Sequence, residues 1–264
     1  MSDLAIVGPT NQTLNIIKNA KKTYNCMVVT LFSNPNENML EEYIKAGIKV
    51  ISLDLSRKFF LLNGSKKLMN VLMKEKCDIV HSYGIKPDIL CSKALRGKKI
   101  PHIITLRNYP LEDVPGRMNK QLGTIIAKLH LHYLTRCKYL IACSDTIRDK
   151  MKKDYPNLKI ISIQNGVDFS RFKQANRTEL RKKFGLNDEI VFISTGSMIP
   201  RKRIDETVDG FIKSQNTYKK KLWLLGDGIL LERLKHKYSE YDNVVFYGKK
   251  SNVVEYLSAA DILI

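Results

Sequence analysis

Short apolar runs recur along the chain, and each is followed by a polar loop and then by a longer stretch in which apolar residues have helical spacing. The runs are rich in Ile and Val and are apolar at successive positions, as strands of a parallel sheet are when helices cover both faces. This alternation predicts an α/β fold with doubly wound parallel sheets. The expected strands are Leu4–Val7, Met27–Phe32, Val50–Leu53, Ile79–His81, His102–Leu106, Tyr139–Ala142, Lys159–Ile163, Ile190–Ser194, Leu222–Leu225, Val244–Tyr247 and Ile262–Ile264.

One expected helix, over residues 119–136, has two distinct faces. A basic stripe, Lys128, His132 and Arg136, recurs every fourth residue and is more typical of a solvated face than of a binding site. His130 and His132 point to different sides of the helix, so they form no metal-binding pair. Five apolar residues at helical spacing are predicted to face the sheet: Leu122, Ile125, Ile126, Leu129 and Tyr133.

The strand rhythm is interrupted between Asp168 and Asn187, where charged residues dominate. We therefore predict a first domain over residues 1–170, a linker over 171–187 that contains a short helix, Thr178–Phe184, and a second domain over 188–264. The last apolar run stops inside what the pattern predicts to be a buried strand. We accordingly expect the second domain to be incomplete and the chain to be a fragment of a longer protein.

Composition excludes several classes of protein. The chain is 44% hydrophobic and 27% charged, as globular domains are, and it has no apolar run of the ~20 residues that span a bilayer. No secretory signal is readable at the N-terminus. The five cysteines contain no Cys-x-x-Cys pair, which argues against a disulfide scaffold and a zinc site and favours reduced thiols in a cytoplasmic protein.

The charge is strongly basic and unevenly distributed. Lys and Arg number 45 against 26 Asp and Glu, a net charge of +19, and residues 1–167 hold 27 of the basic and 13 of the acidic side chains. A basic surface attracts polyanions, namely nucleic acid, an anionic membrane or phosphorylated substrates. A bias of the whole composition toward Lys, Asn and Ile is the alternative explanation. No nucleic-acid-binding motif is present, so we expect no nucleic-acid partner.

Ligands of open α/β sheets bind beyond the carboxyl ends of the strands, and two such positions suit a diphosphate. Gly196 ends an expected strand, and Lys202 and Arg203 follow at the expected start of a helix. Backbone amides, a helix N-terminus and cations would therefore converge there. The second position, Gly226-Asp227-Gly228, would let backbone approach a ligand, although a tight strand–helix turn explains this tripeptide equally well. The chain lacks a Walker A loop, Gly-x-Gly-x-x-Gly, Gly-x-Ser-x-Gly and His-Glu-x-x-His.

Six segments in order resemble the motifs of glycosyltransferase family four, the retaining enzymes of GT-B architecture. They are Asp78–Gly84, Ile141–Ser144, Ile163–Phe172, Gly196–Lys202, Leu225–Gly228 and Val245–Gly248 with Ala260-Asp261. The third resembles the family's Pro-Asn-Gly-Val-Asp…Phe motif, and the fifth matches its Val-Gly-Asp-Gly. Arg107–Asp113 is similar to members that build bacterial capsules and cell envelopes. The family's Glu-x7-Glu motif would fall beyond Ile264.

The resemblance implies two Rossmann-like domains that face a cleft and a UDP- or GDP-sugar donor held mainly by the second. Cations would stabilise the diphosphate leaving group, so we expect neither a metal nor a cofactor. Each matched residue acquires an implied role. Donor binding falls to Gly8, Gly196, Arg201, Lys202, Gly226, Asp227, Gly228, Tyr247 and Lys249, contact with the sugar and acceptor to His81 and Arg107, and Asn165, Gly166 and Asp168 form the central motif.

The implied function is sugar transfer, with retention, to a cell-envelope glycan or lipid-linked acceptor. Two alternatives are a catalytically inactive sugar-nucleotide-binding fragment or scaffold and a basic nucleic-acid-binding protein. The excess of basic residues in the first domain predicts a peripheral position at an anionic inner plasma membrane. Arg57–Leu62 combines two cations with a short apolar cluster, which fits such a contact, while a buried strand edge or a helix start is the competing interpretation.

Overall fold

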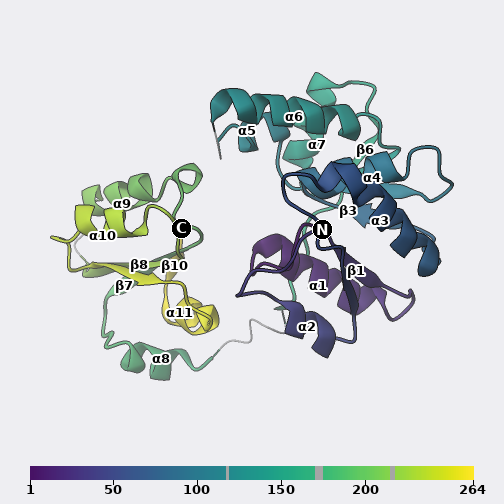
Figure 1. The fold of residues 1–264 in the computed structure, drawn as a ribbon. Helices are drawn as coiled ribbons and strands as arrows, with labels where there is room; N and C mark the ends of the chain where they lie inside the picture. Colours follow the sequence, from purple (N-terminus) through teal and green to yellow (C-terminus); the bar gives the residue numbers. More distant parts are fainter. Residues whose placement is uncertain (117–118, 170–174, 215–217) are drawn as a thin grey trace. The chain divides into compact units, whose positions relative to one another are not determined.

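The computed structural model describes residues 1–116, 119–169, 175–214 and 218–264 (Figure 1). The chain divides into two compact units, Met1–Val167 and Asp168–Ile264. Every strand pair in both units is parallel, and helices alternate with strands along the chain. The predicted α/β class is confirmed.

The first unit contains two parallel sheets where the sequence predicted one. Their strand orders are β1-β2 and β3-β4-β5-β6. The strands are β1 (Met27–Thr30), β2 (Lys49–Ser52), β3 (Val80–Ser82), β4 (His102–Leu106), β5 (Tyr139–Ala142) and β6 (Ile160–Ser162). The helices are α1 (Gly8–Ala20), α2 (Leu40–Lys45), α3 (Phe60–Lys74), α4 (Ile85–Ala94), α5 (Pro110–Asp113), α6 (Lys120–Leu134) and α7 (Asp145–Asp154).

The expected first strand, Leu4–Val7, is wrong. Only Ala5 forms an isolated antiparallel bridge, with Asn38, and α1 begins directly at Gly8. The preceding residues lie along β1 instead, where the Met1 amino group donates to the Val29 carbonyl at 2.9 Å and the Tyr83 hydroxyl contacts the Met1 sulfur at 3.5 Å. The chain thus uses its first residues to contact both sheets, and Val7 precedes the helix.

The predicted face of α6 is also wrong. Leu122, Ile125 and Leu129 are 53%, 64% and 44% exposed, whereas the side that packs on the sheet and on α4 is formed by other residues. Those residues are Gly123, Ala127, His130, Leu131 and Leu134. The helix is apolar around most of its circumference, so periodicity alone did not define its inner side. Small residues form that side because Gly123 lies within contact distance of the backbone of Pro115.

The second unit is a four-stranded parallel sheet in the order β10-β7-β8-β9, with helices on both faces (Figure 1). Trp223 and Leu225 pack with α8 and α11, while the alternating residues Leu222 and Leu224 pack with α9 and α10. The strands are β7 (Ile190–Thr195), β8 (Lys220–Leu225), β9 (Val244–Gly248) and β10 (Ile262–Leu263). The helices are α8 (Arg177–Lys183), a 3₁₀ turn η2 (Pro200–Lys202), α9 (Ile204–Lys213), α10 (Leu231–Lys237) and α11 (Val253–Ala259).

The sequence assigned residues 171–187 to a linker, but α8 lies inside that range and packs in the core of the second unit. Leu180 is buried there, and the rings of Phe184 and Trp223 pack edge to face with their centroids 5.1 Å apart. Arg181 donates to the carboxylate of Asp261 at 3.1 Å, and the Val191 amide donates to the same carboxylate at 2.8 Å. This carboxylate therefore ties α8 to β7 and to the start of β10.

Two leucines of α6 test the corrected helix face. Leu131 is 3% exposed and Leu129 is 44% exposed. We expect Leu131→Ala to lower the free energy of unfolding of the first unit by about 2–5 kcal/mol, because a cavity remains in the core. The matched Leu129→Ala should cost about 0.5 kcal/mol or less. Urea unfolding followed by circular dichroism measures both, and equal losses would contradict the assignment.

Candidate functional site

Three glycines lie together at the carboxyl edge of the second unit's sheet, where β7, β8 and β9 end. The Gly196 amide donates to the Leu225 carbonyl at 2.9 Å, and the Gly226 amide donates to the Gly248 carbonyl at 2.9 Å. All three have positive φ, at +155°, +146° and +69° for Gly196, Gly226 and Gly248. Parallel pairing thus stacks three strand–loop junctions at the edge where α/β sheets bind ligands.

The loops after β7 and β8 approach each other so closely that only glycine fits between them. A Cβ on Gly226 would overlap the carbonyl oxygen of Gly196, and one on Gly228 would lie 2.5 Å from the Met198 oxygen. Asp227 joins the same two loops, because its carbonyl accepts from the Met198 amide at 2.9 Å. Its carboxylate accepts from the Gly228 amide at 2.7 Å. The tripeptide therefore fixes the shape of the Gly196 loop, whether or not it also contacts a ligand.

The cations after this loop are arranged differently from the expected helix start. Lys202 ends the turn η2, Arg203 adopts a left-handed conformation with φ +50°, and α9 begins one residue later. The Arg203 guanidinium pairs with Glu206 at 2.5 Å, which occupies its charge within the first turn of the helix. Arg201 and Lys202 are exposed, and among the described residues the Lys202 ammonium has no carboxylate partner. Lys202 is thus available to an anionic ligand.

Tyr247 belongs to an aromatic cluster in the second unit. The centroid of its half-buried ring lies 4.9 Å from that of Tyr256 and 5.5 Å from that of Trp223. Burial raises the pKa of its hydroxyl. Lys249 is exposed and follows Gly248 at the same edge of the sheet. The ring of Tyr247 therefore has a packing role, and the expected contacts of both residues with a base stay predictions.

A second polar cluster lies at the strand ends of the first unit and centres on Arg107, directly after β4. Its guanidinium lies over the Tyr83 ring at 4.6 Å and donates to the side chain of Gln12, which in turn donates to Asn165. The Thr13 hydroxyl donates to that of Tyr83 at 2.5 Å. The first turns of α1 are thereby joined to the loops after β3, β4 and β6.

Most first-unit residues that the sequence nominated therefore meet at this edge. Gly8 opens α1, and neither it nor Gly166 has an atom within 4 Å of an added Cβ, so both leave space beside their backbone. Asp168 begins the second unit, so the Asn-Gly-Val-Asp motif spans the boundary between the two units. Gln12 was missed by the sequence analysis, because a lone glutamine in a helix carries no motif.

His81 lies on β3 with its Nε2 atom 2.7 Å from the Thr105 hydroxyl on β4. Loss of hydration lowers the pKa of its imidazole, and the charge of Arg107 lowers it further, although Asp88 acts in the opposite direction. The ring is therefore neutral at pH 7. A neutral imidazole can accept a hydrogen bond or a proton from a substrate hydroxyl.

A buried polar network lies beneath these strand ends. The Ser82 hydroxyl donates to Asp88 at 2.6 Å and lies 2.8 Å from Nε2 of His102, while Nε2 of His130 lies 2.8 Å from Asp88. Asp88 is 0% exposed and His130 is 4% exposed. Sequence reasoning gave His130 no ligand role, and the structure places it in a contact with Asp88 that joins α6 to α4.

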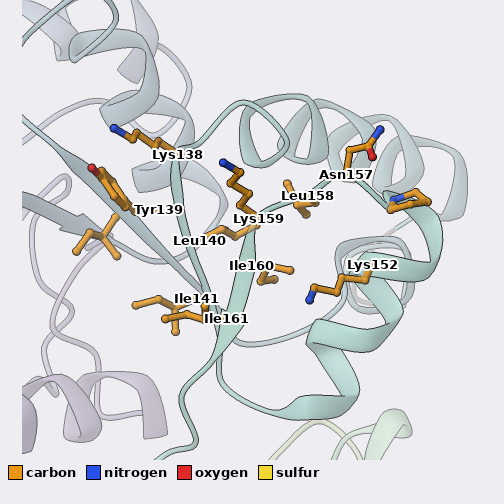
Figure 2. Close-up of a pocket in the computed structure, with 12 residues that line it drawn as sticks. Lys138, Tyr139, Leu140, Ile141, Lys152, Asn157, Leu158, Lys159, Ile160 and Ile161 are labelled. Atoms are coloured by element: carbon orange, nitrogen blue, oxygen red, sulfur yellow. The ribbon is translucent and has the colours of Figure 1, made fainter.

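A hollow of the first unit lies elsewhere, at the amino ends of β5 and β6, with a volume of about 560 Å³. Figure 2 shows Lys138, Lys152 and Lys159 around it, with Tyr139 and Ile161 on its apolar wall. Because ligands of parallel sheets bind at the carboxyl ends, we assign this hollow no part in the candidate site. Within the described ranges, no three His, Cys, Asp or Glu residues are placed to hold a metal ion.

The fold is that of the GT-B glycosyltransferases. The structure superposes on HepE from Anabaena solved with UDP-glucose, with a TM-score of 0.80 at 16% identity over 100% of this chain and 71% of that one. It also superposes on sucrose-phosphate synthase from Thermosynechococcus elongatus, with a TM-score of 0.78 at 15% identity over 99% and 71% of the two chains. The expected GT-B fold is confirmed.

Glycosyltransferase Family 4 matches residues 8–171, and the chain belongs to this family. It is 25% identical to N-acetyl-alpha-D-glucosaminyl L-malate synthase of Bacillus anthracis, over 76% of this chain and 53% of that protein. It is 26% identical to UDP-Gal:alpha-D-GlcNAc-diphosphoundecaprenol alpha-1,3-galactosyltransferase of Escherichia coli, over 85% and 62% of the two. The chain thus spans a little over half the length of these relatives.

The close approach of the two glycine loops predicts a sharp effect of one methyl group. We expect Gly226→Ala to lower the free energy of unfolding of the second unit by about 2 kcal/mol or more, because its Cβ would overlap the Gly196 oxygen. Gly210→Ala in α9, with open space around its Cβ, should instead raise that free energy by about 0.5–1 kcal/mol. Trp223 is the sole tryptophan, so its fluorescence reports the unfolding of this unit. Two equally tolerated substitutions would refute the clash.

The buried network predicts how stability depends on pH. Burial lowers the pKa of His102 to about 4. Between pH 6.5 and 4 the unfolded chain binds a proton that the folded chain does not, so the first unit loses stability as the pH falls. We expect His102→Gln to remove up to about 3 kcal/mol of the difference in free energy of unfolding between pH 7 and pH 4. Urea unfolding at both pH values measures it, and an unchanged difference in the variant would contradict the depressed pKa.

Proposed function

We propose that the protein is the donor- and acceptor-binding part of a retaining hexosyltransferase that uses a UDP- or GDP-sugar and a cell-envelope glycan or lipid-linked acceptor. The observation that carries this proposal is the stack of three glycine junctions followed by the exposed ammonium of Lys202, which has no carboxylate partner among the described residues. Family membership supports it, as do the activities for which the two relatives are named, a hexosaminyl and a galactosyl transfer. Because the chain matches only 53% and 62% of the length of these relatives, the activity of the whole protein is part of this proposal.

The reaction divides between the two polar edges. The bond between the anomeric carbon and the diphosphate oxygen breaks, a bond to an acceptor hydroxyl oxygen forms, and the hydroxyl proton passes to a base, a role that the imidazole of His81 can fill. Negative charge accumulates on the departing nucleoside diphosphate, so a cation beside it stabilises the transition state. Lys202, with Arg201 beside it, supplies that charge from the second unit. The chemistry therefore needs neither a metal nor a cofactor in this proposal.

The first unit supplies groups suited to a sugar hydroxyl. Arg107 is held in place by the Tyr83 ring and Gln12, so its remaining guanidinium N–H groups have a fixed direction. His81 is neutral and can accept the proton of a hydroxyl. We assign contact with the transferred sugar and acceptor to these two side chains, which share one edge of the same sheet.

The location proposed with this function is cytoplasmic and peripheral at the inner face of the plasma membrane. Among the described residues no helix is long and apolar enough to cross a bilayer. The Arg57–Leu62 segment is a turn, residues 57–59, followed by the first residues of α3, and it forms no strand edge. Arg57 pairs with Asp3 at 2.8 Å and lies over Phe32, while Phe60 and Leu61 pack against the core. Half of that segment is thus engaged within the protein.

Donor binding tests the proposal most simply. Titration calorimetry with UDP-glucose, UDP-galactose, UDP-N-acetylglucosamine and GDP-mannose should show binding of one class. Lys202→Ala should weaken it about tenfold to a hundredfold, because a charged hydrogen bond to the diphosphate is lost. Lys213→Ala, which removes the same charge at the other end of α9, is the matched control and should leave binding unchanged.

The outcomes separate the alternatives. Binding followed by donor hydrolysis or transfer, with retained anomeric configuration, supports the enzyme. Binding without turnover supports an inactive sugar-nucleotide-binding scaffold. Absence of binding by every donor, or equal losses in both lysine variants, would overturn the assignment of the site. Affinity for RNA or DNA that survives moderate salt would instead favour a nucleic-acid-binding protein.

A further inference from the structure

The outer face of α6 carries an aliphatic stripe that no described part of the protein covers. Leu122, Ile125 and Leu129 lie three and four residues apart, so they form one continuous line along the helix. Their exposed fractions of 53%, 64% and 44% contrast with 0% for Ala127 on the opposite side. Exposing three adjacent large aliphatic side chains costs free energy in water unless a partner removes them from it.

The residues around this stripe are basic. Lys128 and His132 are exposed on the side of α6 next to the stripe, and Arg136 continues their line just beyond the helix end. From Val114 to Ser144 the sequence contains five Lys or Arg and no Asp or Glu. The charged residues of α6 itself are therefore all basic, and the acidic residues nearest to it in the sequence, Glu112 and Asp113, belong to α5.

We propose that α6 is the element by which the first unit lies on an anionic lipid surface. The aliphatic stripe would enter the boundary between headgroups and acyl chains, and Lys128 and Arg136 would contact lipid phosphates. A helix suits this position because its backbone hydrogen bonds are already made, so only side chains change their environment. The net positive charge of residues 1–167 acts in the same direction over the whole unit.

A lipid surface fits this face better than a folded protein partner does. The stripe is a single convex line of flexible aliphatic side chains, without an aromatic anchor or a hollow that a partner could fill. The helix also follows Arg107 closely in the sequence, with α5 between them, and α5 packs against α6. A lipid-linked acceptor would thus be met by the unit that holds the candidate acceptor residue.

The inference rests on the proposed function for that acceptor, but vesicle binding requires no sugar transfer, so the two can fail separately. The experiment uses the full chain with vesicles of phosphatidylcholine alone and of phosphatidylcholine with 30% phosphatidylglycerol, a composition of about one anionic lipid in three. Co-sedimentation should occur with the anionic vesicles and weaken as salt is raised. The triple substitution Leu122→Asn, Ile125→Asn and Leu129→Asn should reduce the bound fraction at least about tenfold.

A matched variant separates binding through this surface from nonspecific binding through other exposed apolar side chains. Phe59→Asn with Leu62→Asn removes two exposed apolar side chains at the start of α3, where Phe59, the residue before the helix, is 63% and Leu62 is 76% exposed. That variant should keep its binding to anionic vesicles. Circular dichroism verifies that each variant is folded.

Four outcomes would overturn the proposal. The wild-type chain does not bind anionic vesicles, or it binds neutral vesicles equally strongly. The triple variant binds as the wild type does, or only the α3 variant loses binding. Sedimentation velocity adds one more, since a wild-type dimer that the triple variant abolishes would make this face a contact between two copies. Lys128→Ser should lower the salt sensitivity of the binding only slightly, because one of several cations is lost.

Discussion

The parallel pairing of β7, β8 and β9 is the constraint on which the candidate donor site depends, since it brings three strand–loop junctions to one edge of the sheet. At that edge the backbone of Gly226 and Gly228 touches the loop after β7 directly. The loop is therefore shaped by main chain rather than by side chains. A site built this way has its backbone shape fixed before any ligand arrives, which favours binding of a diphosphate.

In the first unit, by contrast, the polar edge is built from side chains. Arg107 is buried enough to need support, and Tyr83 and Gln12 provide it from β3 and α1. Beneath them, Asp88 is shared by Ser82 and His130, so a fully buried carboxylate has hydrogen-bond partners from two other elements. Breaking such a network leaves a buried charge without partners, which ties the geometry of the site to the stability of the unit.

The sequence was sufficient for the class of fold and for most strands, because buried parallel strands are continuous apolar runs. It was also sufficient to place the candidate residues at strand ends, where Gly196, Gly226, Arg107 and Asn165 are found. The sequence was insufficient where one hydrophobic pattern is compatible with more than one packing of a helix. The helix α6 is apolar on most sides, and only the small residues Gly123 and Ala127 allow the close approach that decides its inner face. The contact of Gln12 with Arg107 joins residues far apart in sequence, which no local pattern encodes.

We propose that the glycine junctions and Lys202 bind the diphosphate of a nucleotide sugar. Hydrogen–deuterium exchange of the full chain, with and without saturating UDP or GDP, tests this binding without needing an acceptor. We expect slower amide exchange in residues 196–202 and 226–230, with no change at residues 138–141 and 156–161 around the hollow of Figure 2. Protection confined to that hollow, or none in the glycine loops at saturation, would contradict it.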